Sequence, residues 1–297
     1  MTIRTSVIQR GLSAEWGLSG SDVTPHQGGM NSQTWFVRAG SDRYVAKAVP
    51  PSAHRRFVSG LAVAAIVQEA GVPSGAAVPT RDGRPFAQVD GYTMALLTFV
   101  TGSGLFGREQ AEQRLIGSTL ARVHAALMGS TVPGAARFHW MNPDAEHLGI
   151  RDWVRPAIAG ALEEWESLPP ASLTWGLLHT DPAPEAFLFD GDTGVCSLID
   201  WDTGMEGPLM YNLASAVMYV GGPHDAGALI NAYLEQAVLD RAEVERTIRP
   251  MLRLRWAVQA DYFARRLSTN DLTGIENPGE NELGLEDARK GLAGPVS

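Results

Sequence analysis

The sequence is poor in several features that define common protein classes. Its 297 residues include a single cysteine, Cys196, so neither a disulfide framework nor a thiolate metal cage is available. No apolar run approaches the ~20 residues that a membrane-spanning helix needs. The first residues also lack the apolar core of a signal peptide. We therefore expect a cytoplasmic protein with no membrane partner.

Positive charge is scarce as well. The formal net charge is −9, and no run of Lys and Arg provides the basic face that a nucleic-acid partner would require. An acidic surface serves solubility or attracts cationic small molecules. Only two of the 24 basic residues are lysines, Lys47 and Lys290. A lysine kept in a chain that otherwise uses arginine indicates a specific role.

The character of the chain changes near residue 100. Residues 1–100 predict a helix over 4–20, strands at 23–25, 33–38, 43–49, 87–89 and 93–100, and a helix over 52–70. Residues 101–104 are expected to be a flexible connector. Residues 101–297 then read as mainly helical, with helices predicted at 108–127, 150–168, 211–219, 224–238, 241–268 and 282–293. The pattern favours an α+β chain in two parts.

Two acidic signals flank a predicted hairpin in the second part. His179 and Asp181 lie on one side, Asp200 lies on the other, and residues 188–195 read as two apolar runs around an Asp/Gly turn. Phosphoryl transfer needs two carboxylates in different roles. One accepts the proton of the attacking hydroxyl, and the other holds magnesium. The alternative is that these residues only cap a loop and start a turn.

A second set of residues fits phosphate binding. Gly28 and Gly29 lie between two predicted strands, where their backbone could approach phosphate oxygens, or where they form a simple turn. Lys47 lies on the third strand of this region, residues 43–49. It suits the α- and β-phosphates of a nucleotide, or it is an exposed strand lysine.

In this order, the segments resemble the aminoglycoside-phosphotransferase-type kinases, small-molecule relatives of the protein kinases. The resemblance covers nearly the whole chain and rests on residues 28–32, 45–47, 179–181, 199–202 and 211–214. It implies a two-lobed protein-kinase-like fold. A small antiparallel β-sheet with one helix would form the N-lobe, residues 1–100, and a larger, mostly helical C-lobe would span residues 101–297.

The resemblance also implies ATP and Mg²⁺ as cofactors and a set of site residues. Asp181, with His179 beside it, is implied as the catalytic base, and Asp200 as the principal magnesium ligand. The nucleotide is expected to contact Gly28, Gly29, Asn31, Ser32, Lys47, Thr98, Phe99 and Val100.

The acceptor is expected to be a hydroxyl of a small polar metabolite or antibiotic, with a cationic, amino-sugar-like molecule as one candidate. Its candidate contacts are Asp202, Glu206, Asp261 and Tyr262; alternatively, these residues are solvated surface groups. The protein is expected to be a monomer or a homodimer.

Two departures from the family pattern keep a second interpretation open. The family has an Asn five residues after the base, and this chain has Ala186 there; Glu185 beside it could serve as the second metal ligand or be a surface carboxylate. The family's helix glutamate, which pairs with the nucleotide lysine, would fall at residues 58–60, where no acid occurs. Lys47 is therefore expected to be free or held by a residue that the sequence does not identify. The alternative is a kinase-like binding protein without transferase activity.

Overall fold

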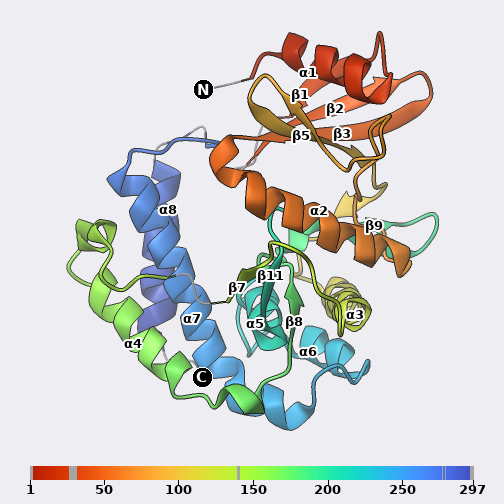
Figure 1. The fold of residues 1–297 in the computed structure, drawn as a ribbon. Helices are drawn as coiled ribbons and strands as arrows, with labels where there is room; N and C mark the ends of the chain where they lie inside the picture. Colours follow the sequence, from red (N-terminus) through yellow and green to blue (C-terminus); the bar gives the residue numbers. More distant parts are fainter. Residues whose placement is uncertain (1–2, 27–31, 139–140, 276, 278, 295–297) are drawn as a thin grey trace.

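The computed structural model describes residues 3–26, 32–138, 141–275, 277 and 279–294. It confirms the expected α+β architecture. A five-stranded antiparallel sheet, with a helix on each face, forms the upper part of Figure 1, and a larger helical part lies below it. No described helix is both long enough and apolar enough to cross a membrane.

The sheet has the strand order β1-β2-β3-β5-β4. Its strands are β1 (Asp22–His26), β2 (Gln33–Ala39), β3 (Asp42–Val49), β4 (Ala87–Val89) and β5 (Tyr92–Thr98). Side chains alternate between the two faces of a strand. Trp35, Ala46 and Ala48 therefore pack toward α1 (Thr5–Gly11), which continues as a short π-helix over Leu12–Trp16. Lys47 points to the opposite face.

The helix α2 (His54–Glu69) packs against two cores. Phe57 and Leu61 lie in a small cluster with Val49 and Ala95 of the sheet. Another stripe of the same helix, which includes Val63, lies in the main core of the helical part. Figure 1 shows α2 running between the sheet and the helices below it.

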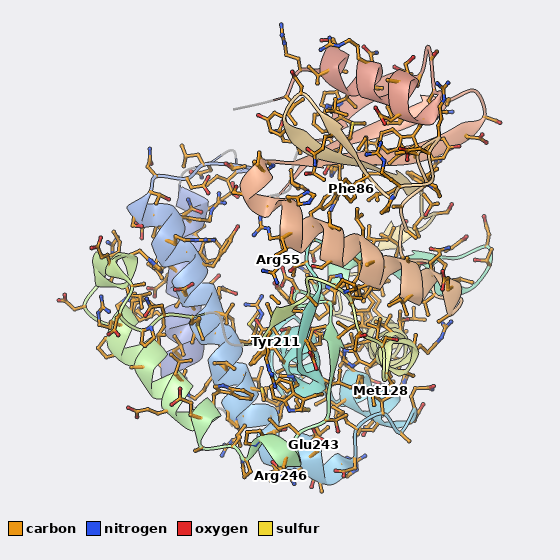
Figure 2. The ribbon with its side chains drawn as sticks, viewed as in Figure 1. Arg55, Phe86, Met128, Tyr211, Glu243 and Arg246 are labelled. Atoms are coloured by element: carbon orange, nitrogen blue, oxygen red, sulfur yellow. The ribbon has the colours of Figure 1, made fainter. Side chains whose placement is uncertain are left out.

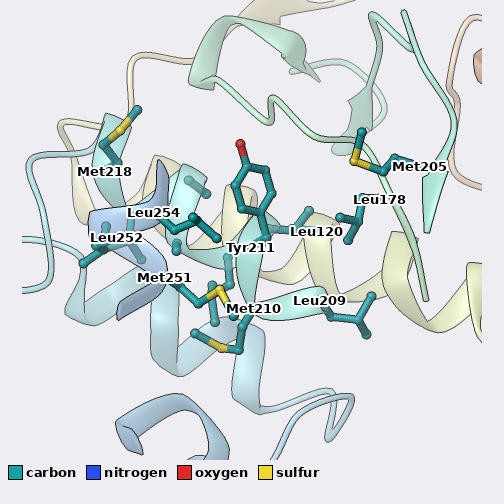
Figure 3. Packing of buried hydrophobic residues seen from close by; sticks show 14 of the residues in the cluster. Leu120, Leu178, Met205, Leu209, Met210, Tyr211, Met218, Met251, Leu252 and Leu254 are labelled. Carbon is teal, nitrogen blue, oxygen red and sulfur yellow. The ribbon is translucent and has the colours of Figure 1, made fainter. Parts of the chain in front are cut away.

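The helical part is built around one large apolar cluster. Its helices are α3 (Gln110–Leu127), α4 (Val154–Glu166), α5 (Leu209–Tyr219), α6 (Gly227–Leu234), α7 (Arg241–Ser268) and α8 (Gly279–Ala293), with short turns at Glu146–Ile150, Pro170–Ser172 and Pro184–Ala186. A further short turn, Pro51–Ala53, leads into α2. Tyr211 of α5 lies in this cluster. Figure 3 shows its hydroxyl turned away from the surrounding Met and Leu side chains.

Two small sheets position the loops of interest. One has the order β10-β9-β6 and contains the predicted hairpin, β9 (Phe187–Asp190) and β10 (Val195–Leu198). Residues 101–104 were expected to be a flexible connector. Two of them form the short strand β6 (Ser103–Gly104), which pairs with β9. The other sheet, β7-β11-β8, joins β7 (Ala136–Arg137), β11 (Met205–Pro208) and β8 (Trp175–Leu178).

Candidate active site

The loop after β8 holds a strained backbone. Thr180 adopts φ = 75°, a left-handed conformation that is costly for a β-branched residue. Its backbone N–H donates to Oδ1 of Asn212 on α5, at 2.9 Å. Asn212 thereby fixes the turn that presents Asp181.

Asn212 is itself held by a buried polar chain. Its Nδ2 donates to Nε2 of His124 on α3 at 3.0 Å, and Nδ1 of His124 lies 2.6 Å from the Tyr233 hydroxyl. Burial lowers the pKa of His124 to about 3, with a smaller contribution from nearby His179. The imidazole is thus neutral, as its hydrogen bond from the amide requires. Both ring nitrogens of this buried histidine thus have polar partners.

His179 lies inside the protein. The residue is 2% exposed, its Nε2 donates to the Ile199 carbonyl at 2.8 Å, and its ring meets Trp201 edge-on at 4.6 Å. Burial lowers the pKa of His179. The ring of His179, expected beside Asp181 in catalysis, therefore contacts the backbone that carries Asp200 and is shielded from solvent.

Asp181 is the exposed carboxylate of the loop. Its side chain is 61% exposed, and its Oδ1 accepts hydrogen bonds from Arg255 Nη2 at 2.9 Å and from the Tyr219 hydroxyl at 2.5 Å. Neither partner stands out in the sequence. Tyr219 is the last residue of α5 and Arg255 lies in the middle of α7, so only the fold brings them to residue 181.

Lys47 reaches across from the sheet to the segment after β10. Its ammonium group binds the carboxylates of Asp200 and Asp202, the latter at 3.0 Å. Burial alone would lower the pKa of Lys47, but the charges of Asp202 and Asp200 hold it above its usual value. The expectation of a free lysine, or one with an unidentified partner, is therefore replaced by two named carboxylates. Asp202, a candidate contact of the acceptor, is one of these two carboxylates.

The missing helix glutamate has a steric explanation. At Gly60 of α2, an added Cβ would lie 2.2 Å from the Trp201 carbonyl oxygen. The neighbouring Ser59 hydroxyl accepts a hydrogen bond from Gly204 N–H at 3.0 Å. The segment 201–204 thus packs directly on α2 where a glutamate side chain would otherwise project. Asp202 of that segment supplies the carboxylate for Lys47.

The acids present fit a magnesium ion held partly by a nucleotide. Asp200 adopts φ = 74° and its side chain is 54% exposed, so its carboxylate is accessible from solvent. Within the described ranges no three His, Cys, Asp or Glu residues form a metal cage. Magnesium in phosphoryl-transfer sites commonly takes one or two carboxylates plus phosphate oxygens and water, which matches this donor set. Glu185 is exposed on the turn after Asp181.

Some of the residues expected to contact the nucleotide lie in the described part of the chain. Gly28, Gly29 and Asn31 lie outside the described residues, whereas Ser32 is half-buried just before β2. At the end of β5, Thr98 N–H donates to the Ala76 carbonyl at 3.0 Å. Two further residues follow: Phe99, whose ring centroid lies 3.6 Å from the Arg43 guanidinium carbon, and half-buried Val100.

The remaining acceptor candidates belong to two elements, β11 and α7. Glu206 is exposed on β11. Asp261 on α7 is bound to Nε2 of His147 at 2.8 Å, so it ties two elements of the helical part together. The Tyr262 hydroxyl accepts from buried Arg266 at 3.3 Å. Arg266 also binds the segment that leads into α8.

The comparison with protein families settles the broader class. The family model described as the phosphotransferase enzyme family matches residues 22–246, which include the sheet, the hairpin and both acidic loops. The chain belongs to this phosphotransferase family. The resemblance noted in the sequence is thereby confirmed.

Curated relatives of this chain include homoserine kinases. The enzyme of Sinorhizobium fredii is 28% identical over 46% of this chain and 44% of its own length. The enzyme of Methylobacillus glycogenes is 26% identical over 76% of this chain and 74% of its own length. The chain thus matches less than half of the first of these relatives.

Solved structures of small-molecule kinases share the fold. An amicoumacin kinase in complex with AMP-PNP and Ca²⁺ aligns over 99% of this chain and 95% of its own, with a TM-score of 0.78 and 12% identity. A microcompartment-associated aminopropanol kinase aligns over 98% of this chain and 96% of its own, with a TM-score of 0.68 and 18% identity.

Proposed function

We propose that the protein transfers the γ-phosphate of ATP, with Mg²⁺, to a hydroxyl group of a small polar metabolite. The observation that carries this proposal is the placement of two accessible carboxylates, one on each side of the same hairpin. Asp181 precedes β9 and Asp200 follows β10. The bond from His179 to the Ile199 carbonyl, at 2.8 Å, joins the two loops directly. Lys47 fixes the second carboxylate from the sheet.

Each residue has a defined task in this reaction. Asp181 orients the acceptor hydroxyl and takes its proton, while Lys47 provides a positive charge for the nucleotide phosphates. Asp200, with Glu185 as the proposed second ligand, would hold magnesium, which neutralises phosphate charge when bound. Thr98, Phe99 and Val100 would border the adenine. The protein's contribution is then mostly positioning and charge neutralisation.

The acceptor proposed is an amino alcohol or a related hydroxylated amine. Homoserine and aminopropanol, which appear in the names of relatives and structural neighbours, both combine an amine with a hydroxyl group. The net charge of −9 favours approach of a cation. Glu206 is the exposed carboxylate proposed to meet the amine.

A second candidate function is nucleotide or metabolite binding without transfer. Two features favour it: Ala186 cannot bind a metal, and Lys47 is already paired with both Asp200 and Asp202. Binding of phosphates by Lys47 would have to compete with these carboxylates.

The deciding experiment measures ADP release with Mg·ATP and a panel of amino alcohols, amino sugars and sugars, alongside hydrolysis by water. We expect turnover that falls ~10²–10⁴-fold in Asp181→Asn, the range typical for loss of a general base. Asp192→Asn, an exposed acid in the turn of the same hairpin, is the matched control. Turnover unaffected by Asp181→Asn would refute the proposal. ATP binding that is indifferent to Mg²⁺ and to Asp200→Ala, without turnover, would select the binding protein.

A further inference from the structure

Only one of the two carboxylate oxygens of Asp181 is engaged. Oδ1 accepts from the Tyr219 hydroxyl at 2.5 Å and from Arg255 Nη2 at 2.9 Å, and Arg255 Nη2 also lies 2.9 Å from the Tyr219 oxygen. The three side chains thus form a closed triangle of contacts. Among the described residues, Oδ2 receives no hydrogen bond.

The two donors approach from the interior. The Arg255 side chain is 8% exposed, compared with 61% for Asp181, and its guanidinium lies 5.4 Å from the centre of the Tyr219 ring. Burial would lower the pKa of Arg255, but Tyr219, Tyr211 and Asp181 hold it above its usual value. The guanidinium is therefore a fixed positive charge beneath the carboxylate.

This arrangement is not explained by folding alone. An exposed carboxylate is well solvated by water and needs no buried partner, whereas a buried guanidinium carries a large desolvation cost. Arg253, two residues earlier on α7, shows the ordinary use of an arginine in this helix. It forms an ion pair with Glu164 of α4 and so joins two helices. Arg255 instead reaches the loop that carries the proposed base.

We propose that Arg255 and Tyr219 are positioning residues that hold Oδ1 of Asp181 and leave Oδ2 free to accept the proton of the acceptor. This inference rests on the proposed function. In the step concerned, the acceptor oxygen bonds to the γ-phosphorus as its O–H bond breaks, and the proton goes to Oδ2. The bond from the γ-phosphorus to the β–γ bridging oxygen breaks, and its electron pair leaves with the nucleoside diphosphate. A carboxylate free to rotate would lose much of this alignment.

The test compares Arg255→Met, Arg255→Lys and Tyr219→Phe with Arg253→Met as the matched control. Rates are measured with Mg·ATP and three acceptors: L-homoserine, 1-amino-2-propanol and water. We expect Arg255→Met to lower kcat ~100-fold while the KM for ATP changes less than about threefold. Arg255→Lys, which keeps the charge and a donor, should recover about tenfold of this loss, and Tyr219→Phe should lose about tenfold. Arg253→Met should keep the wild-type kcat.

Folding and binding are followed in the same variants by thermal denaturation and by calorimetric titration with Mg·AMP-PNP. Unchanged nucleotide affinity with reduced kcat supports positioning. A kcat of Arg255→Met within twofold of an active wild type overturns the inference and leaves the proposed function intact. A raised acceptor KM at constant kcat would also overturn it, because Arg255 would then bind the acceptor. An inactive wild type rejects the proposed function, and the inference with it. If Arg255→Met fails to fold, Tyr219→Phe decides, because it keeps the aromatic ring and removes one donor.

Discussion

Nζ of Lys47 lies 3.0 Å from Oδ1 of Asp202, a residue 155 positions later in the chain. The lysine belongs to β3, and the carboxylate belongs to the segment that follows β10. This pair, with the adjoining contact to Asp200, takes the place of the lysine–glutamate pair that the family forms with a helix. Lys47, the lysine proposed to bind the nucleotide, is therefore held by the same segment that carries the proposed metal ligand.

We predict that Asp202→Asn impairs use of ATP. The amide keeps the shape of the side chain but removes one of two charges that hold Lys47, so we expect kcat/KM for ATP to fall ~10–100-fold. Lys47→Met should lower kcat/KM for ATP by at least the same factor. The double variant should lose less than the product of the two single losses, because both disrupt one contact.

The control for this cycle is the chain's other lysine. Lys290 pairs with Asp287 on α8 at 3.2 Å, and both side chains are well exposed. Lys290→Met and Asp287→Asn should leave ATP kinetics unchanged. Additive losses in the Lys47–Asp202 cycle would contradict the predicted coupling.

We predict that Gly60→Ala is destabilising. The new methyl group would meet the Trp201 carbonyl at 2.2 Å, which involves backbone on both sides and cannot be relieved by a rotamer change. Overpacking of this kind costs about 1–3 kcal/mol. Denaturant unfolding measures the change. Gly227→Ala on α6 is the matched control, since an added Cβ there has no neighbour within 4 Å. Equal stability of the two variants would show that α2 and residues 201–204 can separate freely.

Acid pH should destabilise the protein through His124. The folded pKa is lowered to about 3 from the ordinary value of 6.5, so between these values the unfolded chain binds a proton that the folded one does not. Stability is therefore complete above pH 6.5 and falls as the pH decreases, by about 2 kcal/mol between pH 6.5 and pH 5 from this residue. His179, whose pKa is also lowered, acts in the same direction.

His124→Gln tests this linkage. The amide can still bond Asn212 and Tyr233 but does not titrate, so the loss of stability between pH 6.5 and pH 5 should shrink by about 2 kcal/mol. Urea unfolding at several pH values measures it. His224→Gln, at an exposed position, provides the reference curve. A variant with the same pH dependence as that reference would exclude His124 as the source.

We predict that Glu185→Gln increases the magnesium requirement. If this carboxylate replaces the ligand absent at Ala186, its loss should raise the Mg²⁺ concentration for half-maximal activity about tenfold, the lower range for metal-site changes. Kinetic titration with MgCl₂ at saturating ATP provides the measurement. Glu235→Gln, an exposed acid after α6, controls for lost surface charge. An unchanged magnesium profile would leave Asp200 as the only protein carboxylate proposed for the metal.

The sequence predicted those parts of the fold that local pattern controls. The helix at 241–268 has the predicted bounds, and the hairpin between the two acidic loops forms as expected, because an Asp/Gly turn flanked by apolar runs is a strong local signal. The helix predicted over 224–238 ends at Leu234, and Ala237 adopts φ = 53°. Periodicity did not reveal that break, since no Gly or Pro marks it.

The contacts that complete the site depend on packing between distant segments. Arg255 is 74 residues from Asp181, and it is one of several arginines on α7 with no distinguishing neighbour. The sequence shows Asp202 as an acid close to Asp200. It does not show that Asp202 binds Lys47, because this contact depends on the close packing of residues 201–204 against α2. Gly60 was the one sequence feature that could have indicated this packing. It lies inside a helix, in the range where the family glutamate is expected, and a glycine there indicates that another backbone approaches closely.

The packing of α2 against both the sheet and the large core has a consequence for local unfolding of the protein. Because Val63 and its neighbours belong to the large core, the amides of this helix should exchange with deuterium at the slow rate of the lower helices. The strands above should exchange earlier, as a separate cooperative unit. We therefore expect the boundary between the early-exchanging and the slowly exchanging parts to lie between the sheet and α2, and not at the connector near residue 100.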